Sequence, residues 1–153
     1  MILHSDFTPA GDIWDLLRPA AHNLVHVYKK PLAKIGGRPI IAVQNQADIG
    51  RIEILLEYGG IYLDSDVVVL RPLDIFRESH FAAGKAGSSI NLANGILIAE
   101  PQNSLLTEWL SLWQTYDGTT WNSHSTLLLT KLAKKYPNKV HILLVTVCQI
   151  RIS

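Results

Sequence analysis

The spacing of apolar residues along the chain predicts strands that alternate with helices. Apolar side chains recur with a helical period at 48–58, 104–116 and about 125–136. A short helix is predicted at 12–18, ending before Pro19. Strands are predicted at 24–28, 40–43, 61–70 and 96–99, and loops at 29–39 and at 82–89, the second of them mobile. This alternation predicts the α/β fold class.

Residues 61–70 form the most continuous apolar run, which only the segment from Asp64 to Asp66 interrupts. Such a run predicts a central strand that is buried on both faces. On an extended strand, side chains two apart point to the same side, so Asp64 and Asp66 would be able to share one cation. Hard carboxylate oxygens suit Mg²⁺ or Mn²⁺, and a cation there is well placed to bind a diphosphate. Two solvated acids at a strand end are the alternative, but carboxylates in so apolar a run are costly unless paired or metal-bound.

The helix predicted before this strand carries a second pair of charged residues. Asp48 is a plausible N-cap, and Gly59 is suited to end the helix just before the strand. Asp48 and Arg51 stand three residues apart and therefore share one helical face. Their spacing fits a local ion pair or cap, and equally a sugar clamp in which Asp48 accepts from hydroxyls and Arg51 donates to hydroxyls or phosphate.

Two later segments carry polar residues that suit either turns or a ligand. Asn94 and Gly95 precede a predicted strand, where asparagines are common in turns. Residues 121–125 precede the last helix, and Ser123 or Ser125 is able to cap that helix. The Trp, Asn and His of the same segment are also able to stack on a ligand and hydrogen-bond to it.

Composition narrows the classes of function. The 153 residues fit one domain, and 48% hydrophobic with 18% charged residues predicts a packed core rather than disorder. A net charge of +1 without a basic run argues against nucleic acid as a partner. A single cysteine, Cys148, excludes an intramolecular disulfide framework and a cysteine-based zinc site.

Membrane association is expected only through an anchor outside this chain. Asp6 follows the first residues too soon for the apolar core of a secretory signal. The longest uncharged apolar run near the C-terminus, residues 140–150, is well short of the roughly 20 apolar residues that a membrane span needs.

Taken together, these motifs resemble glycosyltransferase family 32, which includes α1,4-galactosyltransferases, α1,4-N-acetylglucosaminyltransferases and yeast-type α1,6-mannosyltransferases. The block 48–74 resembles the DXD sugar-binding region of that family, and the match to the family pattern is continuous from Asp48 through Asp66. Further similar stretches are found at 2–14, 94–96 and 121–125, so the resemblance covers about residues 2–143.

The resemblance implies a GT-A-type nucleotide-diphospho-sugar transferase fold, a Rossmann-like α/β/α sandwich. One catalytic domain is expected over residues 1–153, with 144–153 as a divergent tail. Because such domains are usually longer than this chain, we expect a truncated member that is incomplete at one or both ends. The implied reaction is metal-dependent, retaining transfer of a hexosyl group from a nucleotide-diphosphate sugar, with UDP-galactose or UDP-N-acetylglucosamine favoured, to a glycan or glycolipid hydroxyl. Eukaryotic members of the family are mostly Golgi proteins.

The resemblance also implies roles for individual residues. Asp66 would be the direct ligand of Mn²⁺ or Mg²⁺, and Asp64 would contact ribose or metal-bound water as the second member of the metal site. Asp48 and Arg51 would hold the donor sugar and, with the two DXD aspartates, form the catalytic set. The remaining substrate-binding positions implied by the family are Gly60, Tyr62, Asn94, Asn122 and His124.

Two alternatives remain open at the level of sequence. Asn45 and Ala47 stand where family members often carry histidine and serine, and residues 143–153 depart from the family pattern. An inactive relative that binds a nucleotide sugar or a partner transferase is one alternative, and its support is the short C-terminal segment. The other is a haloacid-dehalogenase-type phosphatase with Asp64 as nucleophile and Asp66 as acid. That class needs a later pair of acids, whereas Asp117 is the only aspartate after Asp74.

Overall fold

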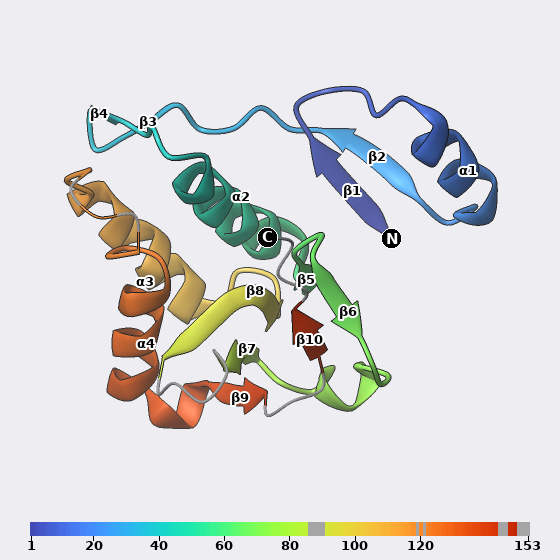
Figure 1. Cartoon of the computed structure of the whole chain (residues 1–153). Coiled ribbons are helices and arrows are strands. Elements are labelled where there is room, and N and C mark those ends of the chain that lie inside the picture. The colour runs from blue at the N-terminus through green and yellow to red at the C-terminus, as the bar shows by residue number, and fades with distance from the viewer. Residues whose placement is uncertain (86–90, 119, 121, 144–146, 150–153) are drawn as a thin grey trace. The chain divides into compact units, whose positions relative to one another are not determined.

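The computed structural model describes residues 1–85, 91–118, 120, 122–143 and 147–149, the last three for their backbone alone. The chain forms two compact units, Met1–Leu32 and Ala33–Ser153. Figure 1 shows the order of the helices and strands within each unit. The predicted divergent tail falls largely outside the described residues.

The first unit is a strand–helix–strand motif. Strand β1 (Ile2–Ser5) pairs in parallel with β2 (Val25–Tyr28), and helix α1 (Asp12–Ala20) connects them (Figure 1). The predicted strand and short helix are therefore confirmed. Pro19 lies inside the last turn of α1 rather than after it, and the helix ends at Ala20.

The second unit opens with a hairpin where the sequence predicts only loop. Strands β3 (Lys34–Ile35) and β4 (Arg38–Pro39) pair in antiparallel fashion around Gly36 and Gly37. Both glycines have positive φ, 56° and 79°. Positive φ at both central residues is what a two-residue type I′ hairpin turn requires. The strand predicted at 40–43 is wrong, because residues 40–42 are irregular and a helix begins at Val43.

Helix α2 (Val43–Tyr58) starts five residues earlier than the sequence predicts. Ala42 is its N-cap, so the predicted capping role of Asp48 is wrong and Asp48 lies in the second turn, where it is buried. The end of the helix is confirmed. Gly59 has φ 65°, and a Cβ there would lie 2.6 Å from Cδ of Pro101, so conformation and space both call for glycine.

A four-stranded sheet forms the centre of this unit, in the order β5-β8-β7-β9 (Figure 1). Strand β8 (Leu92–Ala99) is antiparallel to both β5 (Gly60–Leu63) and β7 (Phe81–Lys85), and β9 (His141–Leu143) is parallel to β7. Residues 82–85 were predicted as part of a mobile loop, but they belong to strand β7. The small side chains at 82–84 let this strand pack tightly in the buried sheet. The rest of that predicted loop lies outside the described residues.

Two amphipathic helices complete the core, as predicted. Helix α3 (Ser104–Leu112) continues as a 3₁₀ turn at Trp113–Thr115, and α4 is Thr126–Lys135. Asn103 caps α3 by accepting from two backbone N–H groups. Residues of α2, α3 and α4 form one buried cluster with the sheet, in which Trp109 and Trp113 are fully enclosed. Short 3₁₀ turns also occur at Asp74–Phe76 and Pro137–Lys139. The α/β fold class is confirmed.

The run at 61–70 is not one buried strand, and this prediction is wrong. Strand β5 ends at Leu63 on the edge of the sheet, and β6 (Val67–Val69) pairs separately with β10 (Val147–Gln149). A turn separates β5 from β6, in which the N–H of Val67 donates to the carbonyl of Asp64 over 3.1 Å. Polar residues at this point favour a turn because two carboxylates would be costly inside a buried sheet.

Candidate functional site

Buried charges meet where α2 lies beside the end of β5. Arg51 of α2 is only 6% exposed, and Nη2 of its guanidinium is 3.3 Å from Oδ1 of Asp64 and 3.5 Å from Oδ1 of Asp48. Its Nη1 donates to the backbone carbonyl of Asn94 over 2.6 Å. The cation therefore links the helix, the DXD turn and β8. We call Asp48, Arg51, Asp64 and Asn94 the buried charge network.

Tyr62 supports this network from within β5. Its hydroxyl donates to Oδ1 of Asp64 over 2.8 Å, and the Arg51 guanidinium carbon lies 4.9 Å from the centre of its ring. Burial raises the pKa of Tyr62 well above its ordinary value, against the opposing effect of the Arg51 charge. The phenol therefore stays protonated and donates to Asp64.

Gly95 leaves the space that the Asp64 carboxylate fills. The N–H of Asp64 donates to the carbonyl of Gly95 over 2.8 Å, and a Cβ on Gly95 would lie 2.9 Å from Oδ2 of Asp64. The Asn-Gly step singled out in the sequence therefore has a physical basis, because the absent side chain admits the first aspartate of the DXD motif.

Asp48 is the more deeply buried of the two acids in the network. Its Oδ1 accepts from the side-chain amide of Asn94 over 2.6 Å, whereas its buried Oδ2 has no partner within the part of the chain that the structure describes. Burial raises the pKa of Asp48, and the Arg51 charge and hydrogen bonds from Ser125 and Asn94 oppose this rise. An unpaired buried carboxylate oxygen is costly and suits a ligand hydroxyl as its missing donor.

We expect Asp48→Asn to raise the melting temperature at neutral pH. Because the pKa of Asp48 is higher in the folded than in the unfolded state, folding stability falls as pH rises through the folded-state pKa. The amide removes this cost, and each 1 kcal/mol gained would add roughly 2–4 °C in a chain of about this size. The gain should shrink near pH 4, where the unfolded carboxyl also takes up a proton.

Thermal unfolding of both proteins at about pH 4 and pH 7.5 measures this effect. Asp74→Asn is a matched control, because Asp74 is two-thirds exposed and its ion pair with Arg77 lies at the surface. A variant at position 48 that is no more stable than the natural protein at the higher pH would contradict the prediction.

Asp66 lies in the same turn as Asp64 and is half-buried. The argument that both aspartates share one side of an extended strand does not apply, because the chain turns between them. Among the described residues no group of three or more His, Cys, Asp or Glu side chains is arranged to hold a metal ion. Two carboxylates on one turn still fit Mg²⁺ or Mn²⁺ chemically, since such ions commonly take one or two carboxylates and complete their shell with water and substrate phosphates.

His124 lies apart from the charged groups of the network. Its ring packs against Trp113 and Tyr116, with centroids 5.5 and 5.6 Å away, and its nitrogens contact the hydroxyls of Thr115 and Ser123. Burial lowers the pKa of His124. The structure thus places this predicted ligand residue in an aromatic cluster, one residue before Ser125.

The other predicted ligand residues are also placed outside the network. Gly60 lies at the far end of β5 from Asp64, opposite Ala99, and borders a hollow that Arg77 also lines. The backbone carbonyl of Asn122 accepts from the N–H of Leu127 at the start of α4. Trp121, the aromatic ligand candidate, lies outside the described residues.

Ser125 joins the network although the sequence suggested only a capping role. It occupies the N-cap of α4, but its side chain makes no capping hydrogen bond. Instead its hydroxyl oxygen accepts from the Asn94 amide over 2.8 Å. Two features of the sequence marked Ser125: its position beside His124 at a helix start, which favours capping in most proteins, and the resemblance of residues 121–125 to the family.

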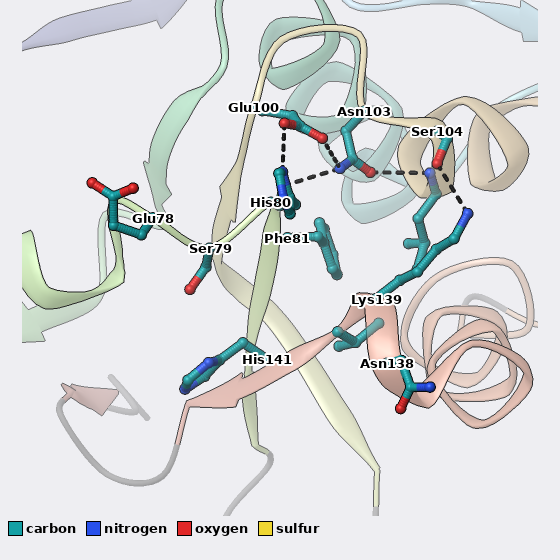
Figure 2. Close-up of a pocket in the computed structure, with 12 residues that line it drawn as sticks. Glu78, Ser79, His80, Phe81, Glu100, Asn103, Ser104, Asn138, Lys139 and His141 are labelled. Atoms are coloured by element: carbon teal, nitrogen blue, oxygen red, sulfur yellow. Dashed lines mark hydrogen bonds and ion pairs between the residues drawn. The ribbon is translucent and has the colours of Figure 1, made fainter.

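A separate hollow of about 520 Å³ lies at the opposite end of β7 and β8 (Figure 2). Its wall contains a hydrogen-bonded corner in which His80 Nδ1 is 2.7 Å from a Glu100 oxygen, and Asn103 donates to the His80 carbonyl. The hydrogen bond and charge of Glu100 raise the pKa of His80. Because Asn103 also caps α3, these hydrogen bonds stabilise the connection between β8 and that helix.

Comparison with known proteins identifies the class to which this site belongs. Residues 15–82 match the family model of the glycosyltransferase sugar-binding region containing the DXD motif. The chain is 31% identical over 149 residues to glucan organizing enzyme 1 of Cryptococcus neoformans var. grubii, covering 92% of the chain and 40% of that protein. It is 32% identical over 89 residues to human alpha-1,4-N-acetylglucosaminyltransferase, covering 58% of the chain and 25% of that protein.

A third relative, an uncharacterized protein of Arabidopsis thaliana, is 35% identical over 94 residues, which cover 60% of the chain and 14% of that protein. Residues 15–82 therefore carry the glycosyltransferase sugar-binding region with the DXD motif, as the motifs of the chain predict, and the mixed α/β structure is consistent with a GT-A-like domain. It spans less than half the length of each of these relatives. None of the helices in the described residues combines the length and hydrophobicity that a membrane crossing requires.

Proposed function

We propose that this chain is the donor-binding part of a metal-dependent, retaining glycosyltransferase. The donor would be a nucleotide-diphosphate sugar, with UDP-galactose or UDP-N-acetylglucosamine favoured, and the acceptor a hydroxyl of a glycan or glycolipid. The observation that carries the proposal is the buried charge network beside the DXD turn, because it joins an unsatisfied carboxylate, a buried guanidinium and the motif aspartate. A Golgi location for a eukaryotic member is part of this proposal.

The donor sugar would bind at Asp48 and Arg51. Oδ2 of Asp48 is a buried acceptor without a protein partner among the described residues, so a sugar hydroxyl would supply the donor it lacks. Arg51 is held by four groups, two carboxylates and two backbone carbonyls, and therefore loses little conformational freedom when it donates to a ligand. Asn94 and Tyr62 would act beside them, since Asn94 orients Asp48 and Tyr62 orients Asp64.

Asp64 and Asp66 would hold Mn²⁺ or Mg²⁺ together with the donor diphosphate. When bound, such an ion neutralises negative charge that develops on a leaving diphosphate. Arg51 would add fixed positive charge from a buried position, where electrostatic stabilisation is stronger than in water. Gly60, Asn122 and His124 remain proposed donor-site positions, and their support is the family resemblance alone.

Calorimetric titration tests the donor site directly. We expect UDP-galactose or UDP-N-acetylglucosamine to bind in the presence of Mn²⁺, and Asp66→Ala to weaken this binding by more than about 100-fold, since even residues that only support metal ligands often cost 10–100-fold. Asp74→Ala is the matched control, because it removes an exposed surface carboxylate nearby in sequence and should leave binding unchanged.

The two outcomes separate the alternatives. Mn²⁺-dependent binding that Asp66→Ala abolishes would support the donor site and justify a screen of acceptors. Binding without hydrolysis or transfer to any acceptor would favour the inactive, nucleotide-sugar-binding relative. Absence of binding to both donors by a folded protein would contradict the proposal.

A further inference from the structure

Ser125 lies where three elements of the candidate site meet. It is 1% exposed at the N-terminus of α4, and the side chain of Asn94 connects it to Asp48 of α2. The Asn94 amide donates to Oδ1 of Asp48 over 2.6 Å and to Oγ of Ser125 over 2.8 Å. Both hydrogens of one NH₂ group are therefore used within the site.

This pair of hydrogen bonds fixes the orientation of the amide. A carboxylate only accepts hydrogen bonds, so the nitrogen of Asn94, and not its oxygen, must face Asp48. The Ser125 oxygen accepts from the same nitrogen, and the proximity of Ser125 also lowers the pKa of Asp48, against the larger effect of burial. The serine thus restrains both partners.

The backbone before Ser125 is anchored from the other side. The indole nitrogen of Trp109 donates to the carbonyl of His124 over 2.7 Å, and the His124 ring packs against Trp113 and Tyr116. The hydroxyl of Ser125 makes no capping bond to α4, although serine at an N-cap usually does. Its position is therefore set by the core, and its hydrogen-bonding capacity is directed to the site.

We propose that Ser125 is a positioning residue for the donor sugar, which holds the Asn94 amide and the Asp48 carboxylate in place without touching the sugar itself. This inference rests on the proposed function and extends it to a residue outside the DXD block. It assigns the start of α4 a role in sugar recognition that is separate from recognition of the nucleotide.

Comparison of UDP with UDP-sugar binding tests this role. In the presence of Mn²⁺, Ser125→Ala should weaken binding of the better of UDP-galactose and UDP-N-acetylglucosamine by up to roughly tenfold, because the Asn94 amide that donates to Asp48 loses its second acceptor. Binding of UDP should change less than about twofold. Ser123→Ala is the control, since it removes a hydroxyl from the same segment that contacts Thr120 and His124 instead.

Each outcome decides between the claims. A Ser125→Ala protein that loses UDP and UDP-sugar equally, or neither, would overturn the positioning role while leaving the proposed function intact. A natural protein that binds neither ligand would contradict the proposed function and with it the sugar-positioning role.

A measurement on the ligand-free protein guards against loss of folding as the cause. The side-chain amide signals of Asn94 in a ¹⁵N–¹H NMR spectrum, assigned with Asn94→Ser, should move in Ser125→Ala and stay in place in Ser123→Ala. Backbone signals of α2 that remain unchanged would show that the variant is folded. Asn94 amide signals that do not move in Ser125→Ala would overturn the inference.

Discussion

Replacing Arg51 with methionine should destabilise the protein by about 3–5 kcal/mol, the usual cost of breaking a buried ion pair from one side. The variant keeps much of the apolar stem but removes the charge that faces Asp48 and Asp64. It also leaves the Asn94 carbonyl without its 2.6 Å donor. Because Arg51 is 6% exposed, water cannot readily replace the lost guanidinium.

Chemical denaturation of matched variants isolates the cause. Arg77→Met removes an arginine from a surface pair with Asp74, in which both side chains are about two-thirds exposed or more, and should have little effect. The double variant Asp48→Asn with Arg51→Met should recover part of the loss, because one of the two uncompensated acids becomes neutral. A loss of less than about 1 kcal/mol in Arg51→Met would show that the guanidinium does not compensate buried charge.

The same ion pairs explain how the site would be organised before a ligand arrives. Arg51 contacts groups from α2, β8 and the turn after β5. A ligand that binds this guanidinium therefore meets donors whose positions are already set, which lowers the entropic cost of binding. Arg51 is thus expected to contribute both to folding stability and to ligand binding. Asp48, in contrast, is expected to lower folding stability while it supports ligand binding.

The sequence predicted the parts of the site that depend on local spacing. Asp48 and Arg51 were placed on one helical face, and the structure brings them within 3.5 Å. The alternative of a local ion pair is therefore correct as a description of the ligand-free structure, and the sugar clamp remains a proposal. The Asn-Gly step was also singled out, and Gly95 does admit the Asp64 carboxylate.

What the sequence could not show depends on contacts between distant residues. The polar side chains in the first turn of α2 made the start of this helix unrecognisable from the apolar pattern. One of them, Asn45, is nevertheless fully buried, and its amide donates to the Tyr116 hydroxyl, 71 residues away. Ser125 likewise reaches Asn94 across 31 residues. The local pattern of polar and apolar residues assigns such residues to loops or helix caps, since it carries no information on the distant residues to which they hydrogen-bond.

The strand prediction at 61–70 failed for a different reason. Its apolar residues suggested burial, but β5 is an edge strand, and residues such as Ile61 and Leu63 are about 40% exposed. An apolar run can therefore consist of two short strands when polar residues in its middle form a turn. At this site the turn matters more than the strand, because it carries Asp64 and Asp66 out of the sheet.

Trp109→Ala should cost about 3–5 kcal/mol, the usual range for deleting a buried tryptophan from a packed core. Trp109 is fully enclosed in the cluster formed by the helices and the sheet, and its indole nitrogen is the donor that anchors His124. The loss should therefore have two components, one from the cavity and one from the unpaired His124 carbonyl.

Two phenylalanine variants separate these components. Trp113 is equally enclosed, but its indole nitrogen has no hydrogen-bond partner within the described residues. Both substitutions remove similar volume, so Trp109→Phe should be less stable than Trp113→Phe by about 1 kcal/mol or more, the cost of an unsatisfied buried carbonyl. Urea denaturation measures both. If the two variants are equally stable, the Trp109 hydrogen bond does not anchor the 124–125 backbone, and the fixed position of Ser125 must be due to packing of the His124 ring.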